Sequence, residues 1–386
     1  MKKKKIFIVA GEASGDIIGS NLIKSMESSQ YEIYGIGGDM MRDAGVKILF
    51  HFEKIAIIGL FEVLLNSFKL IQCMKQTIAE IIKYKPDLII TIDSPGFNFR
   101  VIKSLRKLLA FKSIHYVAPS VWAYGASRAK IVSNLYEHIL LIFPFEQDYF
   151  SHMPHTFVGH PIVEDNTCLL KTISTEDVTV RDRVILDSKE WIIAILPGSR
   201  KSEIKKHIQT LIKTINLLNQ SFQSKQKLKF IFLTLPHLKN FLSNYLKDLS
   251  NIDVIISSDV EDHNRIIQSS ILGIVKSGTA TMRFMANATP AITFYKVSPI
   301  TAWIMRRKLK ITKFNLCNII MKSDVLPECI QENFTVNNLL KQCMEVISNY
   351  AKRLEIIRVY LEVWKTLQQD EKPSVIAANI ISEYLK

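Results

Sequence analysis

Short apolar runs alternate with helical patterns through both halves of this 386-residue chain. Such alternation is typical of α/β folds, in which helices join the strands of a largely parallel sheet. Because ligands of these sheets bind beyond the carboxyl ends of the strands, the loops that follow the runs are the first places to look for a site. The expected strands are residues 5–10, 32–36, 88–92, 113–117, 139–142 and 156–158 in the first half, and 191–196, 229–234, 254–257, 272–276 and 291–294 in the second.

The length of the chain is sufficient for two domains, each with a core of its own. We expect an N-terminal domain over 1–165, a C-terminal domain over 166–345 and closing helices over 346–386. Each domain is expected to contain one parallel sheet. The closing helices are expected to pack back on the first domain or on a partner subunit.

The charge balance favours an anionic partner. Fifty Lys and Arg against 36 Asp and Glu give a net charge of +14, which suits nucleic acid, a phosphorylated metabolite or an acidic membrane surface. The five cysteines form no C-x-x-C pair, so neither a zinc site nor a disulfide framework is indicated, and a reducing compartment is expected. Residues 55–74 are apolar but contain Glu62, Asn66 and Lys69, so they do not form an uninterrupted membrane span.

The stretch 191–206, WIIAILPGSRKSEIKK, predicts a buried strand, a tight turn at Pro197 and Gly198, and a helix start from Ser199 onward. A helix start carries free backbone amides and the positive end of the helix dipole, and Arg200 adds a forked cation. We interpret this turn as the site that holds the diphosphate of a nucleotide donor. An ordinary connection with an exposed arginine is the alternative.

A second loop of this kind follows the expected strand 272–276. Ser277, Gly278, Thr279 and Thr281 present small groups and backbone donors at another helix start, which suits a phosphate or a ribose. Two anion-suited helix starts in one sheet are harder to explain by packing than either loop alone.

Polar residues also follow the strands of the first half. The loop 10–16, AGEASGD, offers Glu12, Ser14 and Asp16, which suit sugar hydroxyls or an acceptor phosphate, while helix capping by Asp16 is an equal alternative. The loop lacks the G-x-G-x-x-G pattern, so a nicotinamide cofactor is not supported. Asp93 follows a buried strand, where apolar surroundings raise the pKa of a carboxyl and suit a general base, and capping of the next helix is its alternative role.

Two further features bear on partners. Basic residues gather at 306–313 beside Trp303 and Ile304, a pattern that suits either anionic lipid headgroups or a solvated helix face. The sequence contains no D-x-D pair, so a diphosphate held through a metal between such aspartates is not indicated, and no metal or other cofactor is expected.

Nine motifs, taken in their order and spacing, resemble those of the lipid A disaccharide synthases, which are glycosyltransferases of the GT-B fold. They are AGEASGD (10–16), GIGGDMM (35–41), TIDSPGFN (91–98), YVAPSVWAY (116–124), PFE (144–146), FVGHP (157–161), LPGSRKSEI (196–204), SGTATM (277–282) and LPECIQ (326–331). The resemblance implies two Rossmann-like domains whose parallel sheets face a cleft. It also implies an inverting, metal-independent transfer of 2,3-diacylglucosamine from its UDP derivative to 2,3-diacylglucosamine 1-phosphate, which gives the β-1,6-linked lipid A disaccharide 1-phosphate and UDP.

The resemblance also assigns roles to residues. Asp93 is the expected base, and Arg200 is the expected stabiliser of the leaving diphosphate. The remaining implied contacts are Gly198, Ser199, Arg200, Ser277, Gly278, Thr279, Ala280, Asn318 and Gln331 for the UDP donor, and Glu12, Ser14, Asp16, Ile58, Leu60, Phe61 and Leu64 for the acceptor and its acyl chains.

Two positions depart from the family pattern. Gly96 stands where the family usually has a second aspartate, and Arg283 stands where it tends to have a glutamate that accepts ribose hydroxyls.

The implied location is cytoplasmic, at the inner face of the inner membrane, with a peripheral membrane contact. No nucleic-acid partner is implied, and a homodimer is one option. The alternatives are a UDP-N-acetylglucosamine epimerase on the same scaffold and a non-catalytic protein that binds an anionic surface.

Overall fold

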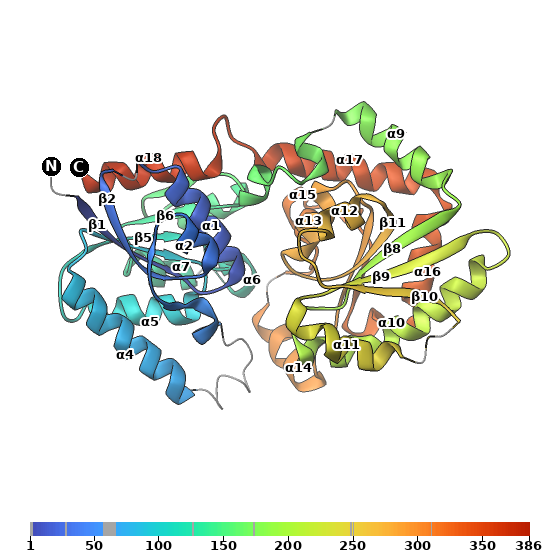
Figure 1. Cartoon of the computed structure of the whole chain (residues 1–386), viewed down its shortest axis with the longest axis horizontal. Coiled ribbons are helices and arrows are strands. Elements are labelled where there is room, and N and C mark those ends of the chain that lie inside the picture. Colours follow the sequence, from blue (N-terminus) through green and yellow to red (C-terminus); the bar gives the residue numbers. More distant parts are fainter. Residues whose placement is uncertain are drawn as a thin grey trace. The chain divides into compact units, whose positions relative to one another are not determined.

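A computed structural model describes residues 3–27, 29–56, 67–125, 127–172, 174–247, 249, 251–309 and 311–386. The chain divides into two compact units, one made of Met1–Pro161 and Leu367–Lys386 and the other of Ile162–Thr366 (Figure 1). The expected acyl-chain contacts Ile58, Leu60, Phe61 and Leu64 lie outside the described residues. No helix in the described ranges is both long enough and apolar enough to cross a bilayer.

The first unit contains a seven-stranded parallel sheet in the order β3-β2-β1-β4-β5-β6-β7. The register pairs Ile8 of the central strand with Gly35 on one side and Ile90 on the other. A continuous apolar run lets β1 be buried on both faces, as a central parallel strand requires. The strands are β1 (Lys4–Ala10), β2 (Tyr31–Gly37), β3 (Lys47–His51), β4 (Leu88–Ile92), β5 (Lys112–Tyr116), β6 (His138–Leu141) and β7 (His155–Phe157).

Helices cover this sheet, and the last helix of the chain is one of them. The terminal helix packs against α1, where the hydroxyl of Ser25 donates to that of Ser374 at 2.8 Å. Lys112 Nζ also donates to the carbonyl of Tyr384 at 2.8 Å. The expectation that closing helices over 346–386 return to the first domain is therefore confirmed for residues 367–386, whereas residues 346–366 belong to the second unit. The helices are α1 (Ala13–Lys24), α2 (Asp39–Asp43), α4 (Ser67–Tyr84), α5 (Pro95–Leu105), α6 (Val121–Tyr124), α7 (Ser127–Ser133), α8 (Gln147–Phe150) and α18 (Pro373–Leu385).

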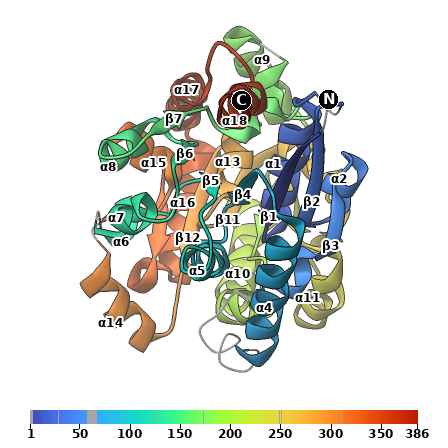
Figure 2. The same ribbon diagram turned by 90° about the vertical axis from the view of Figure 1, so that its left-hand side faces the viewer.

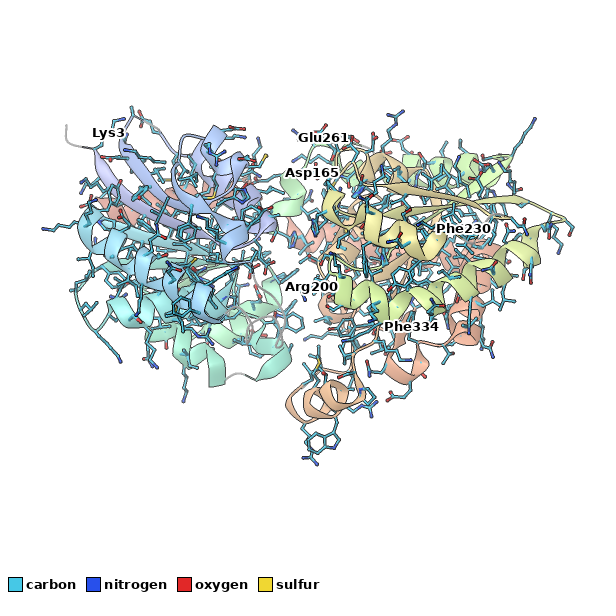
Figure 3. All side chains as sticks on the ribbon, turned by 60° about the horizontal axis from the view of Figure 1, so that its bottom comes forward. Lys3, Asp165, Arg200, Phe230, Glu261 and Phe334 are labelled. Atoms are coloured by element: carbon cyan, nitrogen blue, oxygen red, sulfur yellow. The ribbon has the colours of Figure 1, made fainter. Side chains whose placement is uncertain are left out.

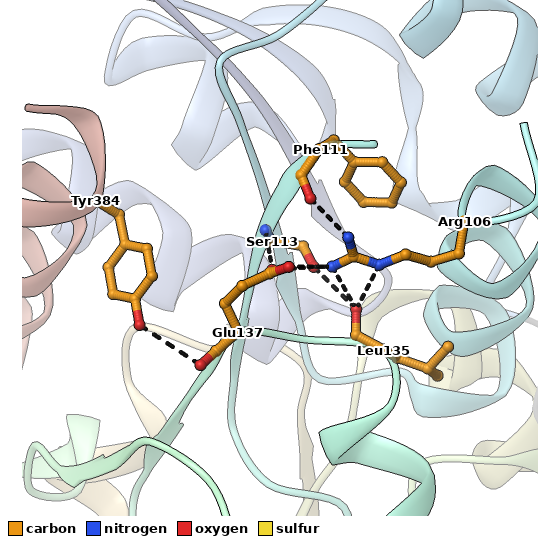
Figure 4. A network of polar contacts seen from close by, with 6 residues as sticks. All are labelled: Arg106, Phe111, Ser113, Leu135, Glu137 and Tyr384. Carbon is orange, nitrogen blue, oxygen red and sulfur yellow. Dashed lines mark hydrogen bonds and ion pairs between the residues drawn. The ribbon is translucent and has the colours of Figure 1, made fainter. Parts of the chain in front are cut away.

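An arginine network holds the amino-terminal end of this sheet together (Figure 4). Arg106 Nη2 lies 2.6 Å from a carboxylate oxygen of Glu137 and also donates to the carbonyl of Leu135 at 3.0 Å. Its Nη1 donates to the carbonyl of Phe111 at 2.7 Å, so one side chain satisfies acceptors on three residues. The network connects the end of α5 to the chain entering β5 and β6, at the edge opposite the carboxyl ends of the strands.

The second unit contains a six-stranded parallel sheet in the order β10-β9-β8-β11-β12-β13. Its core includes Ala194, Val275 and Phe284, and Phe230 of β9 is fully buried (Figure 3). The strands are β8 (Glu190–Leu196), β9 (Lys227–Leu233), β10 (Asp253–Ser257), β11 (Ser270–Lys276), β12 (Ala291–Tyr295) and β13 (Glu328–Ile330). The helices are α9 (Thr175–Leu186), α10 (Lys201–Phe222), α11 (Lys239–Leu246), α12 (His263–Gln268), α13 (Ala280–Ala286), α14 (Pro299–Lys308), α15 (Leu316–Met321), α16 (Val336–Ser348) and α17 (Tyr350–Leu367).

A buried ion pair fixes α17 within this unit. Arg353 Nε lies 3.2 Å from Asp182 Oδ2 of α9, and both side chains are 1% exposed. Arg353 also donates to the carbonyls of Val346 and Ile347 at the end of α16. Hydrogen bonds to several acceptors are what a buried charge requires.

Every expected strand is present, with ends that differ by no more than two residues from the expected ones. The sequence reading missed β3 and β13, which form one edge of each sheet. The two-sheet α/β class is therefore confirmed, but one strand of each sheet was not predicted.

Candidate functional site

Two loops of the second unit meet where the strand order of its sheet reverses. The chain runs from β8 outward through β9 and β10, and then returns to place β11 on the other side of β8. At such a switch point the loops after the two central strands diverge and leave a crevice beyond their carboxyl ends. Here a cavity of about 200 Å³ lies at that position. Its lining residues are Leu196, Gly198, Ser199, Leu233, Thr234, Leu235, Val260, His263, Lys276, Ser277, Gly278, Thr279, Ala280 and Arg283.

The loop after β8 needs glycine at its second position. Gly198 has a φ of +131°, and a Cβ added there would lie 2.8 Å from the side chain of Glu203. The turn therefore brings the backbone close to a carboxylate, which an L side chain at this position would prevent. Figure 3 labels Arg200, which lies at the start of α10.

Glu203, in the first turn of α10, binds this loop, and the sequence analysis predicted no role for it. Its Oε2 accepts the backbone amide of Ser199 at 3.0 Å. Its Oε1 lies 3.0 Å from Lys276 Nζ and 3.4 Å from Arg200 Nη1. The carboxylate thus joins the two loops and orients two of the cations beside the cavity. A glutamate at the third helical position, reaching back to the residues before the helix, is the signal that would have found it.

The charge of Glu203 is stabilised by these partners. Burial raises the pKa of its carboxyl, but Lys276, Arg200 and the amide of Ser199 outweigh burial and lower the pKa below 4.5. The group is therefore ionised at neutral pH. Since amides in the first turn of a helix have no intrahelical acceptors, those that follow Ser199 remain suited to an anionic ligand.

A buried histidine connects the same loop to the end of β12. His207 Nδ1 lies 3.2 Å from the carbonyl of Pro197, and Nε2 lies 3.0 Å from the carbonyl of Lys296. Burial lowers the pKa of His207, although both carbonyls act in the opposite direction. Through these contacts the ring holds the turn before Gly198 in place.

The loop after β11 has the same glycine requirement. Gly278 has a φ of +146°, and its carbonyl accepts the hydroxyl of Thr281 at 2.7 Å. The hydroxyl of Ser277 donates to the carbonyl of Phe314 at 2.8 Å, so its oxygen keeps acceptor capacity only. One cavity therefore brings together several of the predicted contacts of the UDP donor, namely Ser199, Ser277, Gly278, Thr279 and Ala280.

Arg283, one of the two departures from the family pattern, lies in the wall of this cavity. Its Nε and Nη2 donate to the side-chain oxygen of Asn264 at 3.1 and 2.9 Å, and Asn264 in turn donates to Asp165 at 3.2 Å. Burial lowers the pKa of the guanidinium, and Asp165 opposes that effect. Lys276 and Arg283 both line the cavity, and of these two cations Glu203 pairs with Lys276.

Two other expected donor contacts are engaged within the protein. Asn318 is 1% exposed and uses its amide to hold Leu326 and Glu328. The side-chain oxygen of Gln331 accepts the amide of Val297 at 2.6 Å. Neither lines the cavity described above, and their contact with a donor stays a prediction.

The first unit has a switch point of its own, between β1 and β4. A Cβ on Gly11, after β1, would lie 2.3 Å from the hydroxyl of Ser94, after β4, so these two loops touch. Asp93 and Ser94 have φ values of +50° and +46°. Successive left-handed residues other than glycine are strained, and such strain is concentrated at functional sites.

Asp93 has the property expected of a base candidate. Burial raises the pKa of its carboxyl above 3.8, against a smaller lowering by the backbone of Ser94. Asn98 donates to the carbonyl of Asp93 at 2.7 Å and fixes the turn. The helix-capping alternative has no support here, because the helix after Asp93 has no side-chain cap.

The acceptor-side residues differ in how they are placed. Asp16 is 4% exposed and its carboxylate accepts three backbone amides, from Gly38, Met40 and Met41. It connects α1 to the start of α2, a structural task that leaves little capacity for a ligand. Glu12 is half-buried and Ser14 is exposed at the same end of the sheet.

A second carboxylate that the sequence reading left without a role lies in the PFE segment. Glu146 is 1% exposed and accepts the amides of Ile142 and Phe143 just after β6. Burial raises its pKa to about 8, against lowering by these two amides and by Trp122. Within the described ranges, no three His, Cys, Asp or Glu side chains are grouped to hold a metal ion.

Comparison with known proteins decides the family. The family model described as lipid-A-disaccharide synthetase matches residues 6–380. The lipid-A-disaccharide synthase of Rickettsia prowazekii is 35% identical over 98% of this chain and 99% of its own length, and that of Rickettsia typhi is 35% identical over the same shares. The chain belongs to the lipid-A-disaccharide synthetase family. It is therefore a glycosyltransferase, and the resemblance drawn from the nine motifs is confirmed.

Solved structures support the fold. A putative UDP-N-acetylglucosamine 2-epimerase from Listeria monocytogenes has a TM-score of 0.64 at 11% identity, and covers 99% of this chain and 95% of its own. The UDP-GlcNAc 2-epimerase of Methanocaldococcus jannaschii, solved with UDP-GlcNAc and UDP, has a TM-score of 0.62 at 13% identity, over 99% of this chain and all of its own. MurG of Acinetobacter baumannii has a TM-score of 0.58 at 14% identity, again over 99% of this chain and all of its own. These likenesses show the shared fold of two Rossmann-like domains.

Proposed function

We propose that this glycosyltransferase moves 2,3-diacylglucosamine from its UDP derivative to the 6-hydroxyl of 2,3-diacylglucosamine 1-phosphate. The products are the β-1,6-linked disaccharide 1-phosphate and UDP. The observation that carries the proposal is the cavity between the loops after β8 and β11, where Ser199, Ser277 and Lys276 lie together at the switch point of one sheet. Family membership supplies the chemistry of the two sugars.

The donor diphosphate is proposed to lie against this cavity. The first-turn amides of α10 and the backbone of Gly278 and Thr279 would donate to its oxygens. Arg200 and Lys276 would balance the charge that develops on the departing UDP, since preorganised donors at a leaving group act without reorganisation. We therefore propose a metal-independent reaction. Asn318 and Gln331 are kept as proposed contacts of the donor.

The acceptor is proposed to bind at the switch point of the first unit. Asp93 would take the proton of the acceptor's 6-hydroxyl. As it does so, the hydroxyl oxygen attacks the anomeric carbon of the donor sugar, and the bond from that carbon to the diphosphate breaks. A single displacement of this kind inverts the configuration at the anomeric carbon. Glu12 and Ser14 are proposed to contact the acceptor sugar, with Asp16 fixing the backbone beside them.

The lipid substrates bear on location. We propose a cytoplasmic protein held at the inner face of the inner membrane, with Ile58, Leu60, Phe61 and Leu64 as contacts of the acyl chains. A homodimer is proposed as its assembly. None of these proposals involves nucleic acid.

The test is UDP release in detergent from UDP-2,3-diacylglucosamine, with and without 2,3-diacylglucosamine 1-phosphate. We expect release only when both are present, and the same rate with a chelator. A second arm supplies UDP-N-acetylglucosamine alone, because several proteins of the same fold are epimerases of that nucleotide. Formation of an epimer there, with no UDP release in the first arm, would replace the proposed function by an epimerase.

A further inference from the structure

We propose that α14 of the second unit binds the anionic headgroups of a membrane surface through Trp303 and Arg307. This inference deepens the proposed function, on which it rests for the presence of lipid substrates. It assigns the membrane contact to residues outside the acyl-chain segment.

The charge pattern around α14 is one-sided over a long stretch. Residues 263–323 contain no Asp or Glu. The basic residues of this stretch therefore have no acidic partners within it, although Lys276, Arg306 and Lys313 pair with carboxylates from outside it. The basic residues in it are Arg265, Lys276, Arg283, Lys296, Arg306, Arg307, Lys308, Lys310, Lys313 and Lys322.

The geometry of α14 presents an aromatic ring and a guanidinium together. Trp303 is 56% exposed, and Arg307, one turn later, has its Cζ 3.7 Å from the centre of the indole ring. Stacking holds both side chains on one exposed face of the helix, so less freedom is lost when they bind. Arg306 is paired with Glu332, whereas no carboxylate of the described chain forms an ion pair with Arg307.

The helix itself is well formed but weakly packed. The hydroxyl of Ser298 caps it by accepting the amide of Thr301 at 3.2 Å, and Ala302 is buried. Among the described elements, α14 makes only sparse contacts with other helices and strands. Figures 1 and 2 both show it at the edge of the second unit, away from the strands. The exposed indole of Trp303, together with the guanidinium stacked on it, is therefore available to an external partner.

The side-chain chemistry favours lipid over nucleic acid. Indole rings prefer the headgroup level of a bilayer, and arginine side chains extend from there to phosphates. Nucleic acids are bound by open aromatic faces on which bases stack. Here Arg307 covers one face of Trp303, which leaves the ring edge and the guanidinium for contact.

The test is sedimentation of the full-length protein with vesicles of phosphatidylglycerol mixed with phosphatidylcholine, compared with phosphatidylcholine alone. We expect binding only to the anionic vesicles, and weaker binding as salt rises. Arg307→Ala is expected to lower partitioning about fivefold, as each basic residue near an anionic surface contributes about 1 kcal/mol. Trp303→Ala/Arg307→Ala is expected to lower it about 30-fold or more, if the ring contributes as much as the charge.

A matched control is Arg358→Ala, which removes the same charge from an exposed position on α17. It should bind anionic vesicles like the wild type. Equal binding of the wild type to both kinds of vesicle, or equal losses for Arg307→Ala and Arg358→Ala, would overturn the proposal. Displacement from the vesicles by duplex DNA at the same phosphate concentration, but not by inorganic phosphate, would assign α14 to nucleic acid instead.

A last arm separates this inference from the proposed function. UDP release from both acylated sugars dispersed in detergent should be unchanged in Trp303→Ala/Arg307→Ala, because neither residue lines the donor cavity. Normal release without anionic binding by the wild type would refute the inference alone. Anionic binding without release would refute the proposed function alone.

Discussion

Replacing Glu203 by glutamine should make the second unit less stable and at the same time tighten its binding of UDP. The substitution keeps the shape of the side chain and an oxygen that can accept the amide of Ser199. It removes the negative charge that lies 3.0 Å from Lys276 Nζ and 3.4 Å from Arg200 Nη1. The two effects have opposite signs because the charge stabilises the empty site and repels an anionic ligand.

The loss of stability follows from burial. The side chain of Glu203 is 11% exposed and that of Lys276 is 21% exposed, so their contact is largely shielded from water. A hydrogen bond to a charged group contributes about 1.5–3 kcal/mol, and the contact with the more exposed Arg200 adds little. We expect the free energy of unfolding to fall by about 2 kcal/mol at neutral pH.

The stability difference between the wild type and Glu203→Gln should depend on pH. The folded-state pKa of Glu203 lies below 4.5, so its stabilising contribution is complete above that pH and is lost as pH falls through the lowered folded pKa. The difference between wild type and Glu203→Gln should therefore be constant near neutrality and shrink in acid. It should not change between pH 6 and 8, roughly, where the carboxyl is ionised in both states.

The gain in UDP affinity follows from electrostatics. Two unit charges about 8 Å apart interact by about 2 kcal/mol at an effective dielectric constant of about 20. Part of that is lost to screening, so we expect UDP to bind about tenfold more tightly to Glu203→Gln. Glu203→Ala, which also releases the amide of Ser199 and the orientation of Lys276, should instead bind UDP more weakly.

Urea unfolding followed by tryptophan fluorescence measures the first effect, and titration calorimetry with UDP measures the second. Glu362→Gln, an exposed carboxylate on α17, is the matched control and should change neither. Unchanged stability, or weaker UDP binding by Glu203→Gln, would refute the view that this carboxylate balances the cations of a diphosphate site.

Three further substitutions test other parts of the account. Arg200→Ala should lower the rate of transfer about 100-fold or more, as loss of other charge-stabilising donors does, and unchanged turnover in the UDP-release assay would count against the leaving-group role. Asp93→Asn should abolish most transfer, and the wild-type rate should fall with acid through a pKa above 3.8, the direction in which burial moves this carboxyl; a pH–rate profile shared by both proteins would exclude Asp93 as the base. Arg353→Ala should destabilise the second unit by about 3–5 kcal/mol, because Asp182 is left buried and unpaired; a smaller effect in urea unfolding would mean that water reaches the pair.

Most of the strands that the sequence predicted contain a continuous apolar run, and β4 and β6 are buried at every residue. The two missed strands are not buried in this way. β3 has the partly exposed pattern of an edge strand, and β13 spans only Glu328–Ile330. The last pairs with β12 through Thr293 and Glu328, which lie far apart in the sequence. Short edge strands are defined by the neighbour they find in the folded sheet, and local patterns do not contain that information.

The site was predicted where chain order alone determines it. The loops at Gly198 and Gly278 follow buried strands, and the strand order brings their carboxyl ends together at the switch point. The role of Glu203 was not predicted, because its ion pair with Lys276 depends on the tertiary fold. Asp16 was predicted as a ligand contact. In the folded protein its carboxylate instead accepts the amides of Gly38, Met40 and Met41.

A crystal structure of the protein soaked with UDP would show whether the loops after β8 and β11 bind the diphosphate. We expect a diphosphate within hydrogen-bond reach of the first-turn amides of α10 and of the loop at Gly278 and Thr279, with Lys276 beside it. A diphosphate bound elsewhere on the second unit, with the cavity between these two loops empty, would contradict this expectation.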